Sequence, residues 1–302
     1  MLTMQKSLKL IGLYVRSMRP NQWVKNIFIF APMVFAKYIF QSHYLIHTLL
    51  AFALFSLISS SIYVFNDCFD KEKDRQHPDK KKRPVASGAL PIPTAVSIAF
   101  VILLLSLFII YNFNLLFFYI ALFYVGLNLI YSFYLKKIVI LDVMIISIGF
   151  VLRVKIGGVI NDIELSPWIL IITFLLAILL GLIKRRQELV KINAVALPDI
   201  ETRVALKKYN LALLDQLISI TTATTLISYV VYVLNPDVQN KFRTKELYLT
   251  VPFVVFGIFR YLFLTYVKGK GENPAEIIFS DVAFTCNAFM WIMLFILLIL
   301  YK

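Results

Sequence analysis

Long, nearly unbroken runs of apolar residues dominate the chain, and short polar segments separate them. A helix that crosses a bilayer needs about 20 mostly apolar residues. Strands of a membrane barrel would instead alternate apolar and polar side chains, and these runs do not alternate. The pattern therefore predicts an all-α protein, a bundle of about nine transmembrane helices. The predicted spans are 24–40, 45–65, 89–111, 115–135, 138–156, 165–183, 213–234, 247–267 and 282–301.

Composition and charge agree with a membrane protein and indicate its orientation. Hydrophobic residues make up 60% of the 302, more than a soluble domain of this length usually carries. The net charge of +14 would suggest nucleic-acid binding in a soluble protein, but cytoplasmic loops of membrane proteins are rich in Lys and Arg. With the N-terminus in the cytoplasm, the inner segments hold 23 of the 31 Lys and Arg residues; these segments are 1–25, 67–90, 136–137, 184–214 and 268–281. We therefore expect a membrane as partner and no nucleic acid. Only the predicted outer segment 235–246 departs from this distribution of Lys and Arg.

Two inner loops, 67–90 and 184–214, are long and polar. We expect one transmembrane domain over 1–302, with these loops on the side that carries the chemistry. Residues 2–18 have the pattern of an amphipathic helix at the membrane surface. The two cysteines and three histidines form no disulfide framework and no metal-ligand pattern. Acids and cations are therefore the candidate site residues.

Acidic and amide side chains recur at helical spacing where the second predicted span ends. Asn66, Asp70 and Asp74 are spaced i, i+4, i+8 and share one face if the helix continues, with Tyr63 about one turn deeper. Like charges at this spacing repel each other, so the pattern makes sense if a cation lies among them. Mg²⁺ prefers oxygen ligands, takes one or two carboxylates and completes its shell with water and phosphate oxygens.

Cations follow these acids in the sequence. Lys80 and Arg83 would bind the remaining charge of a phosphate group. Asp67 stands at the same membrane boundary as Asn66 and Asp70. The alternative is a solvated cytoplasmic loop of mixed charge, which is the plainer interpretation for Glu72, Asp79, Lys81 and Lys82.

Several stretches resemble a known family of membrane enzymes. NDCFDKEKD at 66–74, followed by HPDKKKRPVASG at 77–88, resembles the first aspartate-rich motif of the UbiA superfamily of intramembrane prenyltransferases. Other stretches are similar to its decaprenyl-phosphate phosphoribosyltransferase branch, and together the motifs cover most of the chain. They are RPNQWVKN at 19–26, YSFYLK at 131–136, LDV at 141–143, GFVLR at 149–153, KRRQEL at 184–189, Arg260-Tyr261, PAEI at 274–277 and Asp281.

The resemblance implies a nine-helix bundle in a bacterial inner (cell) membrane, with the N-terminus and the active site cytoplasmic. It implies Mg²⁺-dependent transfer of 5-phosphoribose from 5-phosphoribosyl 1-diphosphate to a polyprenyl phosphate, giving a precursor of cell-wall glycan. It leaves open whether the protein forms an oligomer. Asp70 and Asp67 are the expected catalytic residues. Asn66, Asp70 and Asp74 are the expected metal ligands. The expected substrate-binding residues are Lys25, Tyr63, Lys80, Arg83, Lys136, Arg153, Lys184 and Arg185.

One motif departs from the superfamily pattern. Most members carry a second aspartate-rich motif after the sixth helix, whereas KRRQEL has Glu188 as its only acid. Cations at this place favour additional phosphate groups, which both the donor and the lipid acceptor would supply. The plainer interpretations are that Lys184, Arg185 and Lys136 anchor the topology, and that Arg153 marks the outer interface.

Two other functions remain open at this point. One is a UbiA-type enzyme that moves a prenyl group from a prenyl diphosphate to an aromatic or lipid acceptor. The other is a lipid transporter without catalysis. Transporters often have helices broken near the middle of the membrane, whereas the acids here lie at the membrane edge, which favours an enzyme.

Overall fold

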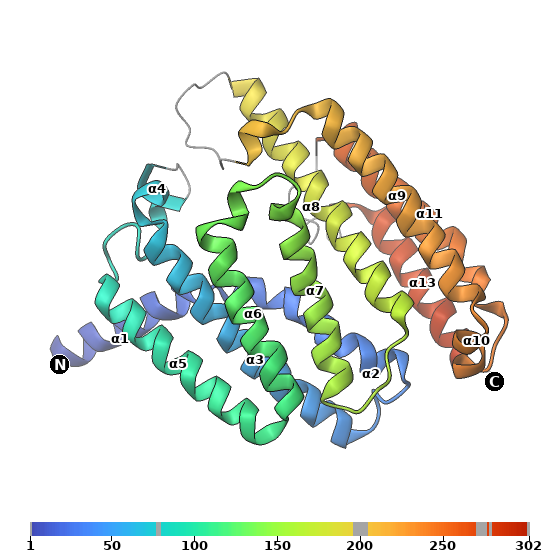
Figure 1. Cartoon of the computed structure of the whole chain (residues 1–302), viewed down its shortest axis with the longest axis horizontal. Helices are drawn as coiled ribbons and strands as arrows, with labels where there is room; N and C mark the ends of the chain where they lie inside the picture. The colour runs from blue at the N-terminus through green and yellow to red at the C-terminus, as the bar shows by residue number, and fades with distance from the viewer. Residues whose placement is uncertain (1, 77–79, 196–204, 270–276, 278–279, 301–302) are drawn as a thin grey trace. The chain divides into compact units, whose positions relative to one another are not determined.

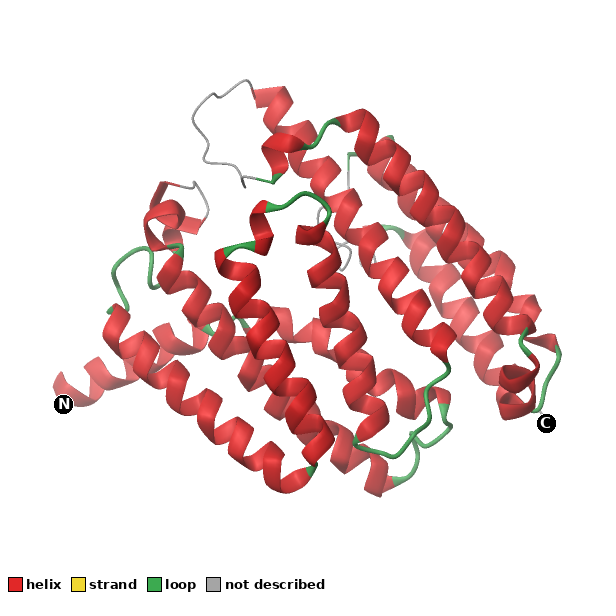
Figure 2. Ribbon diagram, in the orientation of Figure 1, coloured by secondary structure: helices red, strands yellow, loops and turns green. Residues whose placement is uncertain are grey.

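The computed structural model describes residues 2–76, 80–195, 205–269, 277 and 280–300. The all-α prediction is confirmed, because helices, turns and short connections account for all the described residues, and no strand occurs among them (Figure 2). Some residues discussed from the sequence lie outside these ranges, namely His77, Pro78, Asp79, the loop segment 196–204 and 274–276.

The chain divides into two compact units, and helix α7 (Leu141–Val159) contributes to both of them. Unit 1 contains the residues up to Ile138 together with Gly149–Leu165. Unit 2 contains Val139–Ile148 and the described residues from Ser166 onward. The single domain expected over 1–302 stays a prediction, and each unit is described by itself.

Unit 1 is built on α3 (Ser42–Phe69), which packs against α5 (Ile92–Phe113) and α6 (Leu115–Phe133) (Figure 1). The predicted N-terminal helix is confirmed as α1 (Leu2–Ser17), and buried Tyr14 joins Val64 of α3 in one core. Asn114 stands between α5 and α6. It caps the start of α6, because its side chain accepts a hydrogen bond from the Phe117 amide. The shorter elements are η1 (Pro20–Phe30), α2 (Ala31–Phe35), α4 (Lys71–Gln76), η2 (Lys80–Lys82) and η3 (Leu135–Lys137).

Unit 2 packs α8 (Pro167–Val195) against α9 (Leu211–Leu234), and α11 (Val251–Tyr266) against both α9 and α13 (Val282–Leu300) (Figure 1). Leu182, Leu214 and Leu264 belong to its buried core. Asn210 and Asn235 begin α9 and α10 by accepting hydrogen bonds from backbone amides one turn on. The connecting elements are η4 (Leu206–Lys208), α10 (Pro236–Phe242) and η5 (Glu246–Thr250).

Among the described residues, six helices are long and apolar enough to cross a membrane, which makes this a multi-pass membrane protein. They agree with six of the predicted spans. The span predicted at 138–156 corresponds to α7, and the one at 282–301 to the shorter apolar helix α13. The count of nine transmembrane helices stays a prediction. The six are Ser42–Phe69, Ile92–Phe113, Leu115–Phe133, Pro167–Asn193, Leu211–Leu234 and Glu246–Tyr266.

The first predicted span, 24–40, is wrong as a continuous helix. The chain forms the 3₁₀-helix η1 and then the short helix α2, and Pro20 and Pro32 stand in the first turn of each. A proline ring lacks the amide hydrogen that a continuous helix needs, so Pro32 divides the run. Gly157 of α7 lies against η1, where an added Cβ would be 1.9 Å from the carbonyl oxygen of Ile29. This close backbone approach is possible only because Gly157 has no side chain.

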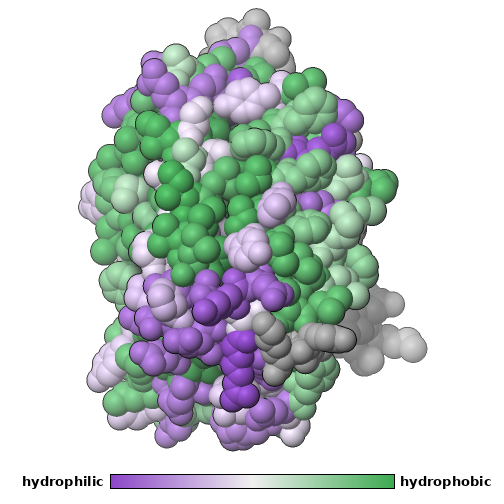
Figure 3. All heavy atoms as spheres, turned by 90° about the vertical axis from the view of Figure 1, so that its right-hand side faces the viewer, coloured by the Kyte–Doolittle hydropathy of each residue, from purple (hydrophilic) through white to green (hydrophobic). Residues whose placement is uncertain are grey.

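The surface agrees with a protein that lies in lipid. Figure 3 views the molecule from the side on which Figure 1 shows α9, α10 and α11, and apolar side chains cover the middle part of this face. Hydrophilic side chains gather lower down, at the level where Figure 1 draws α10. Large apolar side chains exposed on these helices include Ile220, Ile227 and Phe259. An apolar face of this extent is expected where helices contact lipid.

Candidate active site

The predicted acids lie where α3 ends. Helix α3 stops at Phe69 and α4 begins at Lys71, and the joining residue Asp70 has φ −93° and ψ 12°. Regular helix is therefore interrupted at Asp70. The prediction of one shared face for Asn66, Asp70 and Asp74 required an uninterrupted helix, and the partners of these three side chains fall into two sets.

The first set joins the end of α3 to the end of α6. The hydroxyl group of Ser132 hydrogen-bonds the side-chain oxygen of Asn66. The ammonium group of Lys136 donates to both carboxylate oxygens of Asp70, at 2.9 and 3.0 Å. Asn66, Asp70 and Lys136 were all predicted as site residues. Ser132 was not, although it lies inside the quoted motif YSFYLK.

The second set contains two carboxylates and two arginines. Asp67 is only 2% exposed and pairs with both Arg19 and Arg83, the latter at 3.1 Å. Arg83 also binds Asp74, at 2.6 Å. Buried carboxylates are stable only when they are paired, so these arginines account for the burial of Asp67 and Asp74. Arg83 therefore lies beside the predicted acids, and its role as a substrate ligand stays a prediction.

Arg19 is a residue of the cluster that sequence reasoning did not select. Its backbone lies in the left-handed region, at φ 53° and ψ 61°, and Pro20 begins η1 immediately after it. A left-handed conformation costs a non-glycine residue about 1–3 kcal/mol, and it occurs at the turn between α1 and η1. The side chain reaches Asp67, and its guanidinium carbon lies 5.4 Å from the ring centroid of Tyr63. Its place in the motif RPNQWVKN was the available signal.

Oxygen donors suitable for Mg²⁺ are present but few. Asn66 and Asp70 offer an amide oxygen and a carboxylate, which fits a Mg²⁺ ion that arrives with a diphosphate and takes most of its ligands from phosphate and water. Within the described ranges, no group of three or more His, Cys, Asp and Glu side chains is placed to hold a metal. Asp74, predicted as a ligand, is bound by Arg83.

Arg153 is buried inside unit 1 and does not mark an exposed interface. It is 4% exposed and donates to the side chain of Asn26 at 2.7 Å, to the carbonyl oxygen of Gly149 at 2.6 Å and to the hydroxyl of Tyr124 at 3.1 Å. Its guanidinium carbon also lies 5.1 Å from the ring centroid of Phe55. These contacts stabilise a buried cation, and they join η1, α3, α6 and α7.

The other predicted substrate-binding lysines occupy different settings. Lys25 of η1 and Lys80 of η2 are half-buried, and Lys184 of α8 is exposed. Tyr63 is half-buried on α3 beneath Arg19. Their roles as substrate ligands stay predictions.

In unit 2, Arg185 is engaged within the protein. It is 2% exposed and binds Asp142 at 2.7 Å and Glu188 at 2.9 Å. The hydroxyl of Tyr209 donates to the other oxygen of Asp142 at 2.9 Å. Burial raises the pKa of Tyr209 above its ordinary value, so it stays protonated as a donor. The motifs LDV and KRRQEL therefore meet in a buried ion pair.

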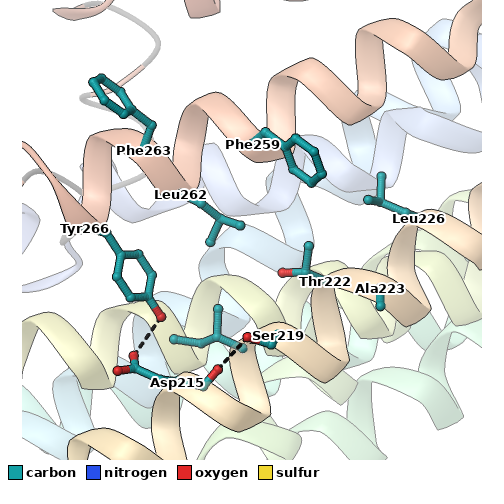
Figure 4. Close-up of a pocket in the computed structure, with 10 residues that line it drawn as sticks. Asp215, Ser219, Thr222, Ala223, Leu226, Phe259, Leu262, Phe263 and Tyr266 are labelled. Atoms are coloured by element: carbon teal, nitrogen blue, oxygen red, sulfur yellow. Dashed lines mark hydrogen bonds between the residues drawn. The ribbon is translucent and has the colours of Figure 1, made fainter.

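A groove of about 590 Å³ runs between α9 and α11. At one end the hydroxyl of Tyr266 points toward Asp215 and donates to it at 2.7 Å (Figure 4). Arg186 pairs with the same carboxylate at 2.6 Å and lies 3.9 Å above the Tyr266 ring. Both helices qualify as membrane spans, so lipid hydrocarbon is the expected neighbour of the groove. Its apolar lining includes Ile218, Leu226, Phe259 and Leu262.

Comparison with known proteins agrees with this fold. A model of the UbiA prenyltransferase family matches residues 26–279. Decaprenyl-phosphate phosphoribosyltransferase of Corynebacterium glutamicum is 30% identical over 284 residues, which cover 92% of this chain and 84% of that protein. The Mycolicibacterium smegmatis protein of the same name is 29% identical over 294 residues, covering 94% and 91%. A UbiA homolog from Archaeoglobus fulgidus, solved with GPP and Mg²⁺, has a TM-score of 0.68 at 19% identity, covering 95% of this chain and 99% of that one.

The chain therefore belongs to the UbiA prenyltransferase family, and it is a transferase rather than a lipid transporter. Within the family it falls in the decaprenyl-phosphate phosphoribosyltransferase branch, because its named relatives match it over nearly the whole chain.

Proposed function

We propose that this protein transfers the 5-phosphoribosyl group of 5-phosphoribosyl 1-diphosphate to a polyprenyl phosphate and releases pyrophosphate. The observation that carries the proposal is the end of α3, where the oxygen donor Asn66 contacts Ser132 and Asp70 pairs with the cation Lys136. The names of the two bacterial relatives support this choice of donor and acceptor.

The reaction needs positioning and charge stabilisation more than proton transfer. The bond between C1 of the ribose and the diphosphate oxygen breaks, and its electron pair leaves with pyrophosphate. An oxygen of the lipid phosphate bonds to C1 from the opposite face, so the anomeric centre inverts. No strong general base is needed, because the attacking phosphate is already an anion.

The site residues divide this work between them. Asp70 and Asn66 would hold a Mg²⁺ ion, which when bound would neutralise part of the charge of the diphosphate. Lys136 stabilises the charge that grows on the leaving pyrophosphate. Asp67 and Asp74 hold Arg83 and Arg19 at the same end of α3.

We place the protein in the inner (cell) membrane of a bacterium, with the N-terminus and this site facing the cytoplasm. The predicted inner segments carry 23 of the 31 Lys and Arg residues, which is the distribution of cytoplasmic loops. A water-soluble, highly charged donor would reach the site from that side.

The test is transfer of radiolabelled ribose phosphate from 5-phosphoribosyl 1-diphosphate into an organic-extractable lipid. Purified protein, polyprenyl phosphate and Mg²⁺ are combined with and without chelator. Label in the lipid that disappears on chelation supports the donor and the metal together. Absence of label with active controls would overturn the proposal.

A paired variant tests the site within the same assay. Asp70→Asn keeps the shape of the side chain but removes the charge, and we expect turnover to fall roughly 100-fold or more, as when a group that stabilises transition-state charge is lost. Glu72→Gln is the matched control, because Glu72 is exposed and pairs with Arg75 within the same short helix α4. Normal turnover of Asp70→Asn would remove Asp70 from the site.

Transfer of a prenyl group from a prenyl diphosphate is the second candidate. The Archaeoglobus fulgidus homolog was solved with GPP and Mg²⁺, which favours it as a family activity. Against it, the only acid of KRRQEL is Glu188, and Arg185 binds it. Product analysis with prenyl diphosphate as donor decides between the two.

A further inference from the structure

A cavity of about 540 Å³ lies in unit 1 beside Asp67, between the end of α1, the start of η1 and the loop after η2. Four cations line it together with that carboxylate, and we refer to it as the cationic cavity. The four are Arg16, Arg19, Lys82 and Arg83. Its volume lies within the range of roughly 300–1,000 Å³ that small-molecule sites occupy.

The charges around the cationic cavity do not balance. Arg19 and Arg83 are matched by Asp67 and Asp74, with which they form ion pairs. Among the described residues, Arg16 and Lys82 pair with no carboxylate, and both are exposed. Two positive charges therefore remain. A phosphate monoester carries about −1.5 to −2 at neutral pH, so one such group would match them.

The lining also provides hydrogen-bond donors. The amide side chains of Asn21 and Gln22 complete the polar wall. Arginine offers donors in a planar fork that suits phosphate oxygens, and lysine offers a compact point charge. Phosphate is a better match for this mixture than a carboxylate, because it presents three acceptor oxygens.

The cationic cavity is distinct from the place proposed for the diphosphate. Asn66 and Asp70 make their contacts with Ser132 and Lys136 on the side of α6. Asp67 instead makes its contacts with arginines that line the cavity. The two sets of partners do not overlap.

We propose that the cationic cavity binds a phosphate monoester group, with Arg16 and Lys82 as its uncompensated cations. The inference rests on the proposed function, in which two such groups occur. One is the 5-phosphate of the donor, and the other is the phosphate of the lipid acceptor.

Binding measurements separate this inference from turnover. Full-length protein is titrated by calorimetry, with chelator present, using ribose 5-phosphate in one arm and geranyl phosphate in the other. Wild type should bind at least one probe. Lys82→Gln and Arg16→Gln should each weaken that binding roughly tenfold, the value of one charge-assisted hydrogen bond. Lys81→Gln is the matched control, because it removes the same charge from an exposed neighbour in η2 that is outside the lining.

The arms identify the source of the phosphate. Weakening confined to ribose 5-phosphate assigns the cavity to the donor, and weakening confined to geranyl phosphate assigns it to the acceptor. Lys82→Arg, which keeps the charge, should retain binding. The inference is overturned if wild type binds neither probe, or if all variants bind like wild type. If wild type binds a phosphate probe but transfers no ribose phosphate to lipid, the proposed function alone is contradicted.

Discussion

The ammonium nitrogen of Lys136 lies 2.9 Å and 3.0 Å from the two carboxylate oxygens of Asp70, although 66 residues separate them in sequence. The two side chains are 27% and 33% exposed. A pair this open to water contributes about 1 kcal/mol or less to stability. The contact therefore keeps a cation at the acid without holding the fold together, and we expect its loss to affect activity.

Replacing Lys136 tests this expectation. Lys136→Gln should lower kcat/KM for 5-phosphoribosyl 1-diphosphate roughly 100-fold, because a charge that stabilises the leaving pyrophosphate is lost. Its melting temperature should stay close to that of wild type. Steady-state kinetics and thermal unfolding in the same detergent measure both quantities.

Lys137→Gln is the control for this variant. Lys137 is the exposed neighbour of Lys136 in η3, and its replacement should leave both quantities unchanged. If Lys136→Gln lowered the melting temperature and kept full activity, the pair would have a structural role instead.

The buried pair of Arg185 and Asp142 predicts the opposite behaviour. Arg185→Met leaves the carboxylate of Asp142 without its guanidinium partner, and loss of one partner of a buried pair costs about 3–5 kcal/mol. The double variant Arg185→Met/Asp142→Leu should recover part of this loss, because no buried charge remains. Thermal or denaturant unfolding measures the difference.

Lys184→Met provides the comparison, since Lys184 is exposed on the same helix and its loss should change stability by less than about 0.5 kcal/mol. A stable Arg185→Met protein with weakened donor binding would show that Arg185 binds substrate directly, as the sequence motif suggested.

Asp281 predicts a dependence on pH. Its hydrogen bond with Arg260 lowers the pKa of Asp281 from its ordinary value of 3.8 to about 2. Because the folded form binds a proton more weakly than the unfolded form, the carboxylate stabilises the fold above about pH 4. That stabilisation is lost as the pH falls toward 2.

The measurement compares the melting temperatures of wild type and Asp281→Asn from pH 7 to pH 3. We expect wild type to be more stable at neutral pH and the difference to shrink in acid. A difference that stayed constant over this range would show that the charge of Asp281 contributes nothing.

Gly157 predicts a steric effect at the contact between α7 and η1. Gly157→Ala places a Cβ 1.9 Å from the carbonyl oxygen of Ile29, so backbone must move, and we expect destabilisation of about 1–3 kcal/mol or more. Gly126 of α6 is the matched control, because an added Cβ meets nothing within 4 Å. Gly126→Ala should be neutral or stabilising by up to about 1 kcal/mol. Equal melting temperatures for the two variants would refute the close approach.

The sequence by itself determined the class of fold and pointed to most of the candidate site. Apolar runs of this length have to be helical in a bilayer, because every backbone polar group must be paired there. Six of the predicted spans are long, apolar helices in the structure. Asn66, Asp67 and Asp70 could be selected because carboxylates at helical spacing need a cation, and the quoted motifs carried the family resemblance over most of the chain.

Only the tertiary structure decided which charges face each other. The interruption of helix at Asp70 sends Asp74 toward Arg83 and leaves Asp70 with Lys136. Arg185 was indistinguishable from Lys184 in KRRQEL, yet one is buried against Asp142 and the other is exposed. No spacing rule could select Arg19, because a left-handed backbone turn brings its side chain to Asp67, which lies 48 residues further along the chain. Contacts between side chains far apart in sequence depend on how helices pack, and periodicity along one helix carries no information about its neighbour.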